Sequence, residues 1–206
     1  RAALLRELRG FFEARGVLEV QTPVLGRHTV TEPAIESLPV TASGLSGWLQ
    51  TSPEYFMKRL LAAGSGSIYQ IGPVFRADEQ GRRHNPEFTL LEWYRVGFDL
   101  EALVDEVADL VQEALHGPGP HVVEYRDLMR DHAGVDPWSD DDGVLAAKAS
   151  AISGIAAAQL NRGEALDLLM SGCVEPALVG KGPVIIQHYP PDQCALATVA
   201  EVGGVR

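Results

Sequence analysis

Two strand-like segments joined by a long polar loop constrain the fold of this chain more than any other feature. Residues 67–76 (SIYQIGPVFR) and 88–95 (FTLLEWYR) are rich in β-branched and aromatic side chains, which is typical of β-strands. The loop between them, residues 77–87, contains charged residues, glycine and proline. It is long for a hairpin connection, and long ordered loops are often functional. The pattern therefore predicts a hairpin with a functional loop.

Side chains alternate between the two faces of a strand, so Arg76, Glu92 and Tyr94 are expected on one face, with Phe88 near the loop. A guanidinium beside a basic loop suits a polyphosphate, and the basic loop residues are Arg82, Arg83 and His84. Carboxylates that suit an exocyclic amine or an ammonium are Asp78, Glu79 and Glu92. An ordinary hairpin with solvated charge pairs is the alternative. Charges and aromatic rings interleave with apolar residues within both strands, which favours a lined cleft.

The composition is that of an ordinary soluble globular protein. A chain of 206 residues suffices for one domain with a sizeable core, and 46% of its residues are hydrophobic and 22% charged. No apolar run approaches the roughly 18 residues of a membrane span. Cys173 and Cys194 have neither metal-ligand spacing nor the pattern of a disulfide framework. We therefore expect a protein of the reducing cytoplasm.

The charge is distributed unevenly along the chain. Residues 1–95 hold 11 Lys/Arg and 10 Asp/Glu, a net charge of +1, whereas residues 96–206 hold 6 and 18, a net charge of −12. A strongly acidic half is a poor surface for nucleic acid, whose binding requires neutralised phosphates. It suits a basic protein partner, or it serves solubility alone.

The first fifty residues predict a helix packed on a sheet edge. Residues 2–15 carry apolar side chains at helical spacing and end at Gly16, and a strand over 17–22 ends at Pro23. Residues 26–47 are expected to form a loop with one short strand over 37–41, and a further strand resumes at 48–50.

A helix is expected to begin after residue 51. Ser52 suits the N-cap, Pro53 the first helical position, and Glu54 the positive end of the helix dipole. This explanation is complete without any catalytic role, so a substrate contact for Glu54 needs other support.

The second half of the chain predicts mostly helices. Asp99 should cap a helix that ends before the Gly-Pro-Gly-Pro sequence at 117–120, and further helices are expected over 125–133, 140–151 and 164–172. The three aspartates at 140–142 follow Ser139 at a helix start, which indicates a solvated turn rather than a metal cluster. Residues 183–189 predict a buried strand, in which His188 is interpreted as a packed residue.

The hairpin carries a family resemblance. Phe75-Arg76, then residues 84–89 (HNPEFT), then Glu92 keep the order and spacing of motif 2 in the lysyl branch of the class II aminoacyl-tRNA synthetases. The ending LEWYR at 91–95 is more similar to the truncated paralogues of that branch that ligate β-lysine to elongation factor P. The resemblance extends from residue 1 to about residue 200. It implies an α+β fold, an antiparallel sheet flanked by helices. It also implies a single catalytic domain over residues 1–206, with the C-terminal part that carries motif 3 missing.

The resemblance also implies roles for single residues. Arg76 matches the catalytic residue that grips the α-phosphate and stabilises developing charge. The positions matched to ATP binding are Arg76, Ala77, Asp78, Glu79, His84, Asn85 and Phe88. Those matched to substrate binding are Ser52, Pro53, Glu54, Glu92 and Tyr94. Asp78 stands where the family usually has glutamate, so the contact with the adenine amine is lost or carried by Glu79. His84 could instead only fix the loop.

The implied reaction is ATP-dependent activation of a lysine-like amino acid, (R)-β-lysine, and transfer of the acyl group to a lysine of elongation factor P. ATP and Mg²⁺ are the implied cofactors; no metal ligand is identifiable in the chain, and the Mg²⁺ ligands are expected in the missing C-terminal part. The N-terminal helix and strand resemble motif 1, which implies a homodimer through residues 1–23. No N-terminal barrel precedes them, which favours the ligase and makes tRNA an unexpected partner. The sequence leaves open whether the substrate is α-lysine or β-lysine. Alternatives are a catalytic fragment of a lysyl-tRNA synthetase and, given the early stop and Asp78, a non-catalytic dimerising paralogue.

Overall fold

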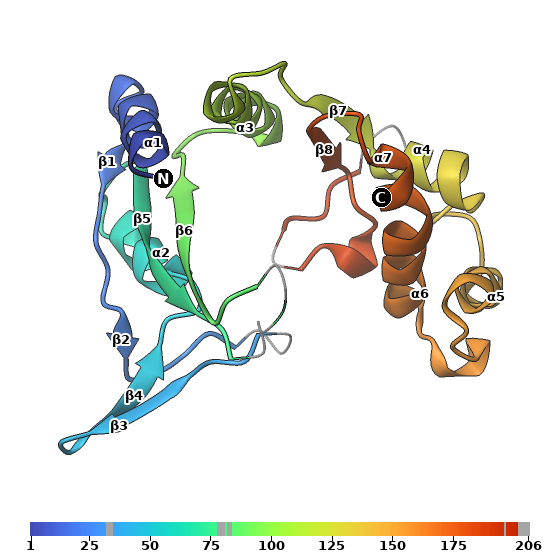
Figure 1. The fold of residues 1–206 in the computed structure, drawn as a ribbon, viewed down its shortest axis with the longest axis horizontal. Helices are drawn as coiled ribbons and strands as arrows, with labels where there is room; N and C mark the ends of the chain where they lie inside the picture. Colours follow the sequence, from blue (N-terminus) through green and yellow to red (C-terminus); the bar gives the residue numbers. More distant parts are fainter. Residues whose placement is uncertain (32–34, 78–80, 82–83, 196, 202–206) are drawn as a thin grey trace. The chain divides into compact units, whose positions relative to one another are not determined.

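The computed structural model describes residues 1–31, 35–77, 81, 84–195 and 197–201. The chain divides into two compact units, residues 1–105 and 106–206, and each is described by itself (Figure 1). This division concerns compactness alone, and the single catalytic domain stays a prediction.

The first unit is built on a hairpin in which β5 (Ile68–Phe75) pairs antiparallel with β6 (Glu87–Tyr94). The register places Ile68 opposite Tyr94 and Phe75 opposite Glu87. Both predicted strands are therefore confirmed. A short strand, β1 (Leu18–Glu19), adds to β5 in parallel, so the strand expected over residues 17–22 is shorter than predicted. After Val20 donates to the Tyr69 carbonyl at 2.8 Å, the chain leaves the edge of β5.

Helix α1 (Ala2–Ala14) lies beside β1 and β5 (Figure 1), and its ring contacts are with Tyr69 and Trp93 of this sheet. The Phe12 ring stacks on Tyr69 with centroids 4.5 Å apart and packs against Trp93 at 5.6 Å. Phe12 is fully buried, whereas Leu4, on the same predicted apolar stripe, is 40% exposed. The predicted helix is confirmed, and only the end of its stripe nearest the sheet is buried.

A second sheet has the order β2-β4-β3, with β2 at Leu25–Gly26, β3 at Pro39–Ala42 and β4 at Leu45–Leu49, all antiparallel neighbours. The turn between β3 and β4 is Ser43-Gly44, with φ of 51° and 81°. Two successive residues with positive φ match the twist of a tight hairpin. The strands expected over 37–41 and from residue 48 are therefore shifted, because the sequence analysis missed this turn.

Helix α2 (Glu54–Ala62) begins one residue away from the predicted arrangement. Pro53, expected at the first helical position, occupies the cap position with φ −76° and ψ 0°. Ser52 precedes the cap, and its Oγ accepts a hydrogen bond from the Glu54 amide at 3.1 Å. The prediction of Ser52 as N-cap was wrong by one position, although its hydroxyl does satisfy a first-turn amide.

Helix α3 (Leu100–Leu115) spans the boundary between the units. Asp99 Oδ1 accepts from the Ala102 amide at 2.8 Å, so the predicted cap is confirmed. No helix among the described residues combines the length and apolarity that crossing a bilayer requires.

The second unit surrounds a parallel strand pair with short helices. Strand β7 (His121–Glu124), which the sequence analysis did not predict, pairs with β8 (Val184–Gln187). The helical segments are α4 (Tyr125–Leu128), a π-helix (Met129–Ala133), α5 (Asp142–Ser153), a 3-10 turn (Ala157–Gln159), α6 (Arg162–Leu169), a second π-helix (Met170–Val174), α7 (Glu175–Leu178) and a 3-10 turn (Pro191–Gln193). The core includes Tyr125, Met129, Leu145, Leu166, Leu169 and Val174.

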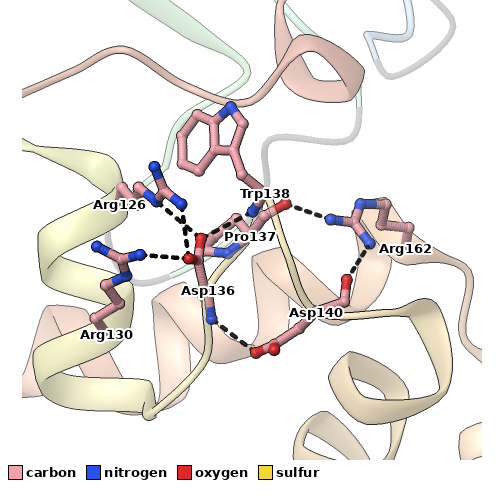
Figure 2. A network of polar contacts seen from close by, with 7 residues as sticks. All are labelled: Arg126, Arg130, Asp136, Pro137, Trp138, Asp140 and Arg162. Carbon is pink, nitrogen blue, oxygen red and sulfur yellow. Dashed lines mark hydrogen bonds and ion pairs between the residues drawn. The ribbon is translucent and has the colours of Figure 1, made fainter. Parts of the chain in front are cut away.

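A polar network organises the chain between the first π-helix and α5 (Figure 2). Arg126 donates to both carboxylate oxygens of Asp136, at 2.9 and 2.8 Å, and Arg130 binds the same carboxylate. The Asp136 amide donates to Asp140 Oδ2 at 2.8 Å. The hydrogen bonds from Arg126 above all hold the pKa of Asp136 well below its usual range.

The aspartates at 140–142 form the predicted turn. Asp141 Oδ1 caps α5 by accepting from the Val144 amide at 2.9 Å, and Asp142 pairs with Arg162 at 2.8 Å. Arg162 also donates to the carbonyls of Pro137 and Asp140. All three aspartates therefore have structural partners.

Candidate functional site

The candidate site lies on the hairpin face that carries Phe88, Glu92 and Tyr94. In the register of β5 and β6, Glu92 stands opposite Gln70 and Phe88 opposite Val74. Opposite residues of an antiparallel pair project from the same face, so the alternation inferred from the sequence holds across both strands.

The carboxylate of Glu92 is held by two hydroxyl groups. Ser52 Oγ donates to Glu92 Oε2 at 2.6 Å, and Tyr94 Oη donates to Glu92 Oε1 at 2.9 Å. Burial, and then the charge of Glu92, raise the pKa of Tyr94 well above its usual value, so the phenol stays a donor through the neutral range. Both bonds fix the carboxylate without neutralising its charge.

A second carboxylate, Glu54, lies in the first turn of α2 and pairs with Lys58 one turn further along. Its charge also contributes to raising the pKa of Tyr94. Pro53, between Ser52 and Glu54, is buried. The structure thus brings together the five residues predicted for substrate binding, two of which are anionic.

Arg76 follows the last residue of β5. Its Nε donates to the Thr51 carbonyl at 3.4 Å, and its guanidinium lies 5.1 Å from the centre of the Phe88 ring. The Arg76 amide donates to the Pro86 carbonyl at 2.9 Å, which joins the two ends of the loop. The candidate phosphate-binding group and the candidate base-stacking ring are therefore neighbours.

The remaining residues predicted for ATP binding lie along the loop. The Ala77 amide donates to the Glu36 carbonyl at 2.9 Å, and Asn85 is exposed. Gly81 and His84 exchange two backbone hydrogen bonds at 3.2 Å, which agrees with the alternative that His84 fixes the loop. Asp78, Glu79, Arg82 and Arg83 lie outside the described residues.

A hollow of about 550 Å³ adjoins the Glu36 segment that receives the Ala77 amide. Its lining combines an indole and aliphatic side chains with hydroxyls and one carboxylate: Thr29, Val30, Ile35, Glu36, Ser37, Pro39 and Trp48. The sequence analysis assigned no residue in this region.

In the described part of the chain, no three or more His, Cys, Asp or Glu side chains are grouped as a metal site would require.

His188 differs from its interpretation as a packed strand residue, which was wrong. It follows β8, takes φ of 54°, and its Nδ1 lies 2.8 Å from Glu124 Oε2. Gln187 Nε2 donates to Glu124 Oε1 at 2.7 Å. Although burial acts in the opposite direction, these two partners hold the pKa of Glu124 below its usual value.

Sequence reasoning also missed two residues beside the site, Gln50 and Thr51. Both are buried, at 7% and 1% exposure. The sequence signal for these two residues was that a strand-like segment ends in two consecutive polar residues. This signal is weak, because polar residues are common directly before the start of a helix.

Comparison with known proteins identifies the family. The model of the class II tRNA synthetases (D, K and N) matches residues 1–127, more than half of the chain. This chain belongs to that family. The predicted class II synthetase fold, antiparallel strands with flanking helices, is thereby confirmed, and the matched residues include the whole hairpin and the candidate site.

Relatives within the family match almost all of the chain. Proteins named elongation factor P–(R)-β-lysine ligase are 44% identical in Yersinia enterocolitica, 43% in Pasteurella multocida and 42% in Haemophilus influenzae. Each comparison covers 97% of this chain and 64% of the relative. The chain thus spans just under two thirds of the length of these class II relatives.

Proposed function

We propose that this protein activates a lysine-like amino acid with ATP and transfers the acyl group to a lysine of elongation factor P. The observation that carries the proposal is the arrangement around Glu92. A half-buried carboxylate held by Ser52 and Tyr94 shares its neighbourhood with a second carboxylate, Glu54. The names of the relatives at 42 to 44% identity support the same activity and the same acceptor.

In the proposed first step a carboxylate oxygen of the amino acid attacks the α-phosphorus of ATP. A bond forms between that oxygen and phosphorus, the bond to the bridging oxygen breaks, and pyrophosphate leaves. Arg76 supplies positive charge where negative charge develops on the phosphate, and Phe88 supplies the apolar ring face for the base. The chain contributes position and electrostatics here, and no protein nucleophile is required.

In the second step the neutral amine of the acceptor lysine attacks the carbonyl carbon of the adenylate. An amide bond forms, AMP leaves with the former phosphate–acyl oxygen, and the amine loses a proton. The ammonium groups of a lysine-like substrate suit Glu92 and Glu54, because opposite charges attract more strongly at half-buried carboxylates than in bulk water.

Mg²⁺ would neutralise phosphate charge in such a reaction. We assign it no ligand among the residues that the structure describes.

We also propose a homodimer through residues 1–23. Leu4 and Leu18 are 40% and 56% exposed there, and burying them against a second copy would be favourable. Placement in the cytoplasm follows from the proposed acceptor, a translation factor.

The test is ATP–pyrophosphate exchange by the full-length natural gene product, with α-lysine and (R)-β-lysine compared side by side. We expect exchange with a preference for (R)-β-lysine. Preference for α-lysine would contradict the proposed substrate, and no exchange with either would favour the non-catalytic paralogue. Transfer is then followed as a mass increase of elongation factor P by one lysyl group.

A second candidate is the catalytic part of a lysyl-tRNA synthetase. The matching family model covers synthetases for aspartate, lysine and asparagine, and this match favours it. Aminoacylation of tRNA by the full-length product would support this candidate over the ligase.

A further inference from the structure

Strand β5 runs beyond the strand that pairs with its outer edge. β1 pairs with Ile68 and Tyr69, and the last backbone bond that the β1 segment makes to β5 runs from the Val20 amide to the Tyr69 carbonyl. β5 continues to Phe75. An edge of this kind presents backbone groups that need partners when they are buried.

Gln50 supplies those partners at the end of β5 that adjoins the candidate site. Its side-chain Nε2 donates to the Pro73 carbonyl at 2.9 Å, and its own carbonyl accepts from the Phe75 amide at 2.8 Å. Gln50 is 7% exposed, so the side chain is held in place by its surroundings as well as by these bonds. One residue thus takes the place of a strand along this edge.

Gln70 performs a similar task at a different place. Its Oε1 accepts from the Thr22 amide at 2.8 Å, and its exposure is 5%. The side chain extends along the strand over Gly72, where an added Cβ would stand 3.5 Å from Gln70 Nε2. Gln70 therefore holds the segment that leaves β1, and it reaches Gln50 only through Thr22, whose Oγ1 donates to Gln50 Oε1 at 3.4 Å.

The two residues after Gln50 make the contacts that orient the candidate site. The Thr51 carbonyl accepts from Arg76 Nε, and Ser52 Oγ donates to Glu92. Because the Gln50 backbone and side chain are both fixed to β5, the position of these two groups depends on Gln50.

We propose that Gln50 is a positioning residue of this site, which holds Thr51 and Ser52 in register with Arg76 and Glu92. This inference rests on the proposed function. Loss of the bond to Pro73 would remove a side-chain anchor of the 50–52 segment on β5 and free that segment to shift. Misplacement of a reacting group by about 1 Å can reduce a rate by about 100-fold.

The experiment compares Gln50→Met with Gln70→Met in the full-length protein. Each substitution removes one part-buried side-chain bond to the backbone from a residue of nearly equal burial. Gln50→Met also removes the 3.4 Å contact with Thr22 Oγ1, which is long for a hydrogen bond, so similar losses in the urea midpoint are expected. Gln70 lies directly opposite Glu92 in the ladder, which makes it a demanding control. In ATP–pyrophosphate exchange we expect kcat to fall at least tenfold in Gln50→Met and to stay within threefold of wild type in Gln70→Met.

Gln50→Leu has a similar volume and also lacks the donor, so it should resemble Gln50→Met, and it replaces that variant if Gln50→Met does not fold. Equal loss of kcat at both positions, or no loss at Gln50, overturns the proposal.

A second measurement separates this inference from the proposed function. If the wild-type protein catalyses no exchange, the function fails, and the Arg76 Nε–H resonance in the ¹⁵N NMR spectrum decides the positioning role. It should shift in the Gln50 variants and stay unchanged in Gln70→Met. A resonance that is unchanged in all variants, or shifted equally in all, would contradict the role of Gln50.

Discussion

Two carboxylates in this chain, Glu92 in the first unit and Asp136 in the second, are each fixed by several hydrogen bonds, but their donors differ in charge. Glu92 accepts from the hydroxyls of Ser52 and Tyr94. Asp136 accepts from the guanidinium groups of Arg126 and Arg130 (Figure 2).

This difference supports the proposal that Glu92 is a binding group and Asp136 a structural one. Neutral hydroxyls orient Glu92 and do not neutralise its negative charge, as the proposed cationic ligand requires. Two guanidinium groups neutralise Asp136, and its side chain is only 12% exposed. These charge-assisted hydrogen bonds therefore stabilise the folded state. By the number of polar contacts alone, the Asp136 network would be the stronger candidate for a functional site. The charge of the hydrogen-bond donors favours Glu92 instead, because its donors are neutral.

The largest effect is expected when one arginine of the candidate site, Arg76, is compared with one arginine of the Asp136 network, Arg126. Arg76→Ala should lower kcat of ATP–pyrophosphate exchange roughly 10²- to 10³-fold, as loss of a transition-state donor does. Arg126→Ala, the matched control, should leave kcat of the folded protein unchanged and lower its urea midpoint. Unchanged exchange in Arg76→Ala would remove Arg76 from the site.

Replacing each carboxylate with its amide should sharpen the contrast between Glu92 and Asp136. Glu92→Gln keeps the shape and removes the charge, and we expect kcat/KM for the amino acid to fall on the order of 100-fold. The urea midpoint should change little, because one hydroxyl can still donate to the amide oxygen and the other can turn to accept from the amide NH₂ group. A fall in stability without a change in kcat/KM would place Glu92 with Asp136 as a structural group.

Asp136→Asn should have the opposite profile. Loss of charge-assisted bonds to Arg126 and Arg130 is expected to lower the free energy of unfolding by about 2 kcal/mol. Urea denaturation at pH 7 measures it, and kcat at saturating substrate should equal that of the wild type. A changed kcat would contradict a purely structural role.

The same residue predicts the acid limb of the stability curve. The pKa of Asp136 is lowered in the folded state, so its stabilising effect is present above the ordinary value of about 4 and is lost as the pH falls below it. Between about pH 4 and 2, wild-type stability should therefore fall more steeply than that of Asp136→Asn. Asp142→Asn is the control, because that side chain is 75% exposed and should not change the slope.

The smallest effect is expected from the phenol that orients Glu92. Tyr94→Phe removes one neutral hydrogen bond of about 0.5–1.5 kcal/mol, so KM for the amino acid should rise roughly three- to tenfold while kcat changes less. Tyr55→Phe, which removes a hydroxyl bonded to Thr31 at 2.9 Å, is the matched control. Equal changes in both variants would indicate a general effect on stability.

Much of the hairpin could be predicted because its signals are local. Period-2 alternation placed Phe88, Glu92 and Tyr94 on one face, and the observed register keeps them there. The cap at Asp99 followed from the same kind of short-range pattern. The turn at Ser43-Gly44 and the strand over residues 121–124 were missed, since a parallel pair such as β7 and β8 depends on a partner some sixty residues away.

By itself, the sequence determined the family, the two long strands and the face on which the candidate groups stand, because spacing along the chain fixes which side chains share a face. Only the tertiary structure decided the partners: Ser52 for Glu92, Gln50 for the open edge of β5, and Arg126 for Asp136. Hydrogen-bonding side chains can each serve many partners, and packing between distant segments selects one. For the same reason the sequence analysis interpreted His188 as a packed residue of the strand over 183–189, whereas the structure pairs it with Glu124, the last residue of β7.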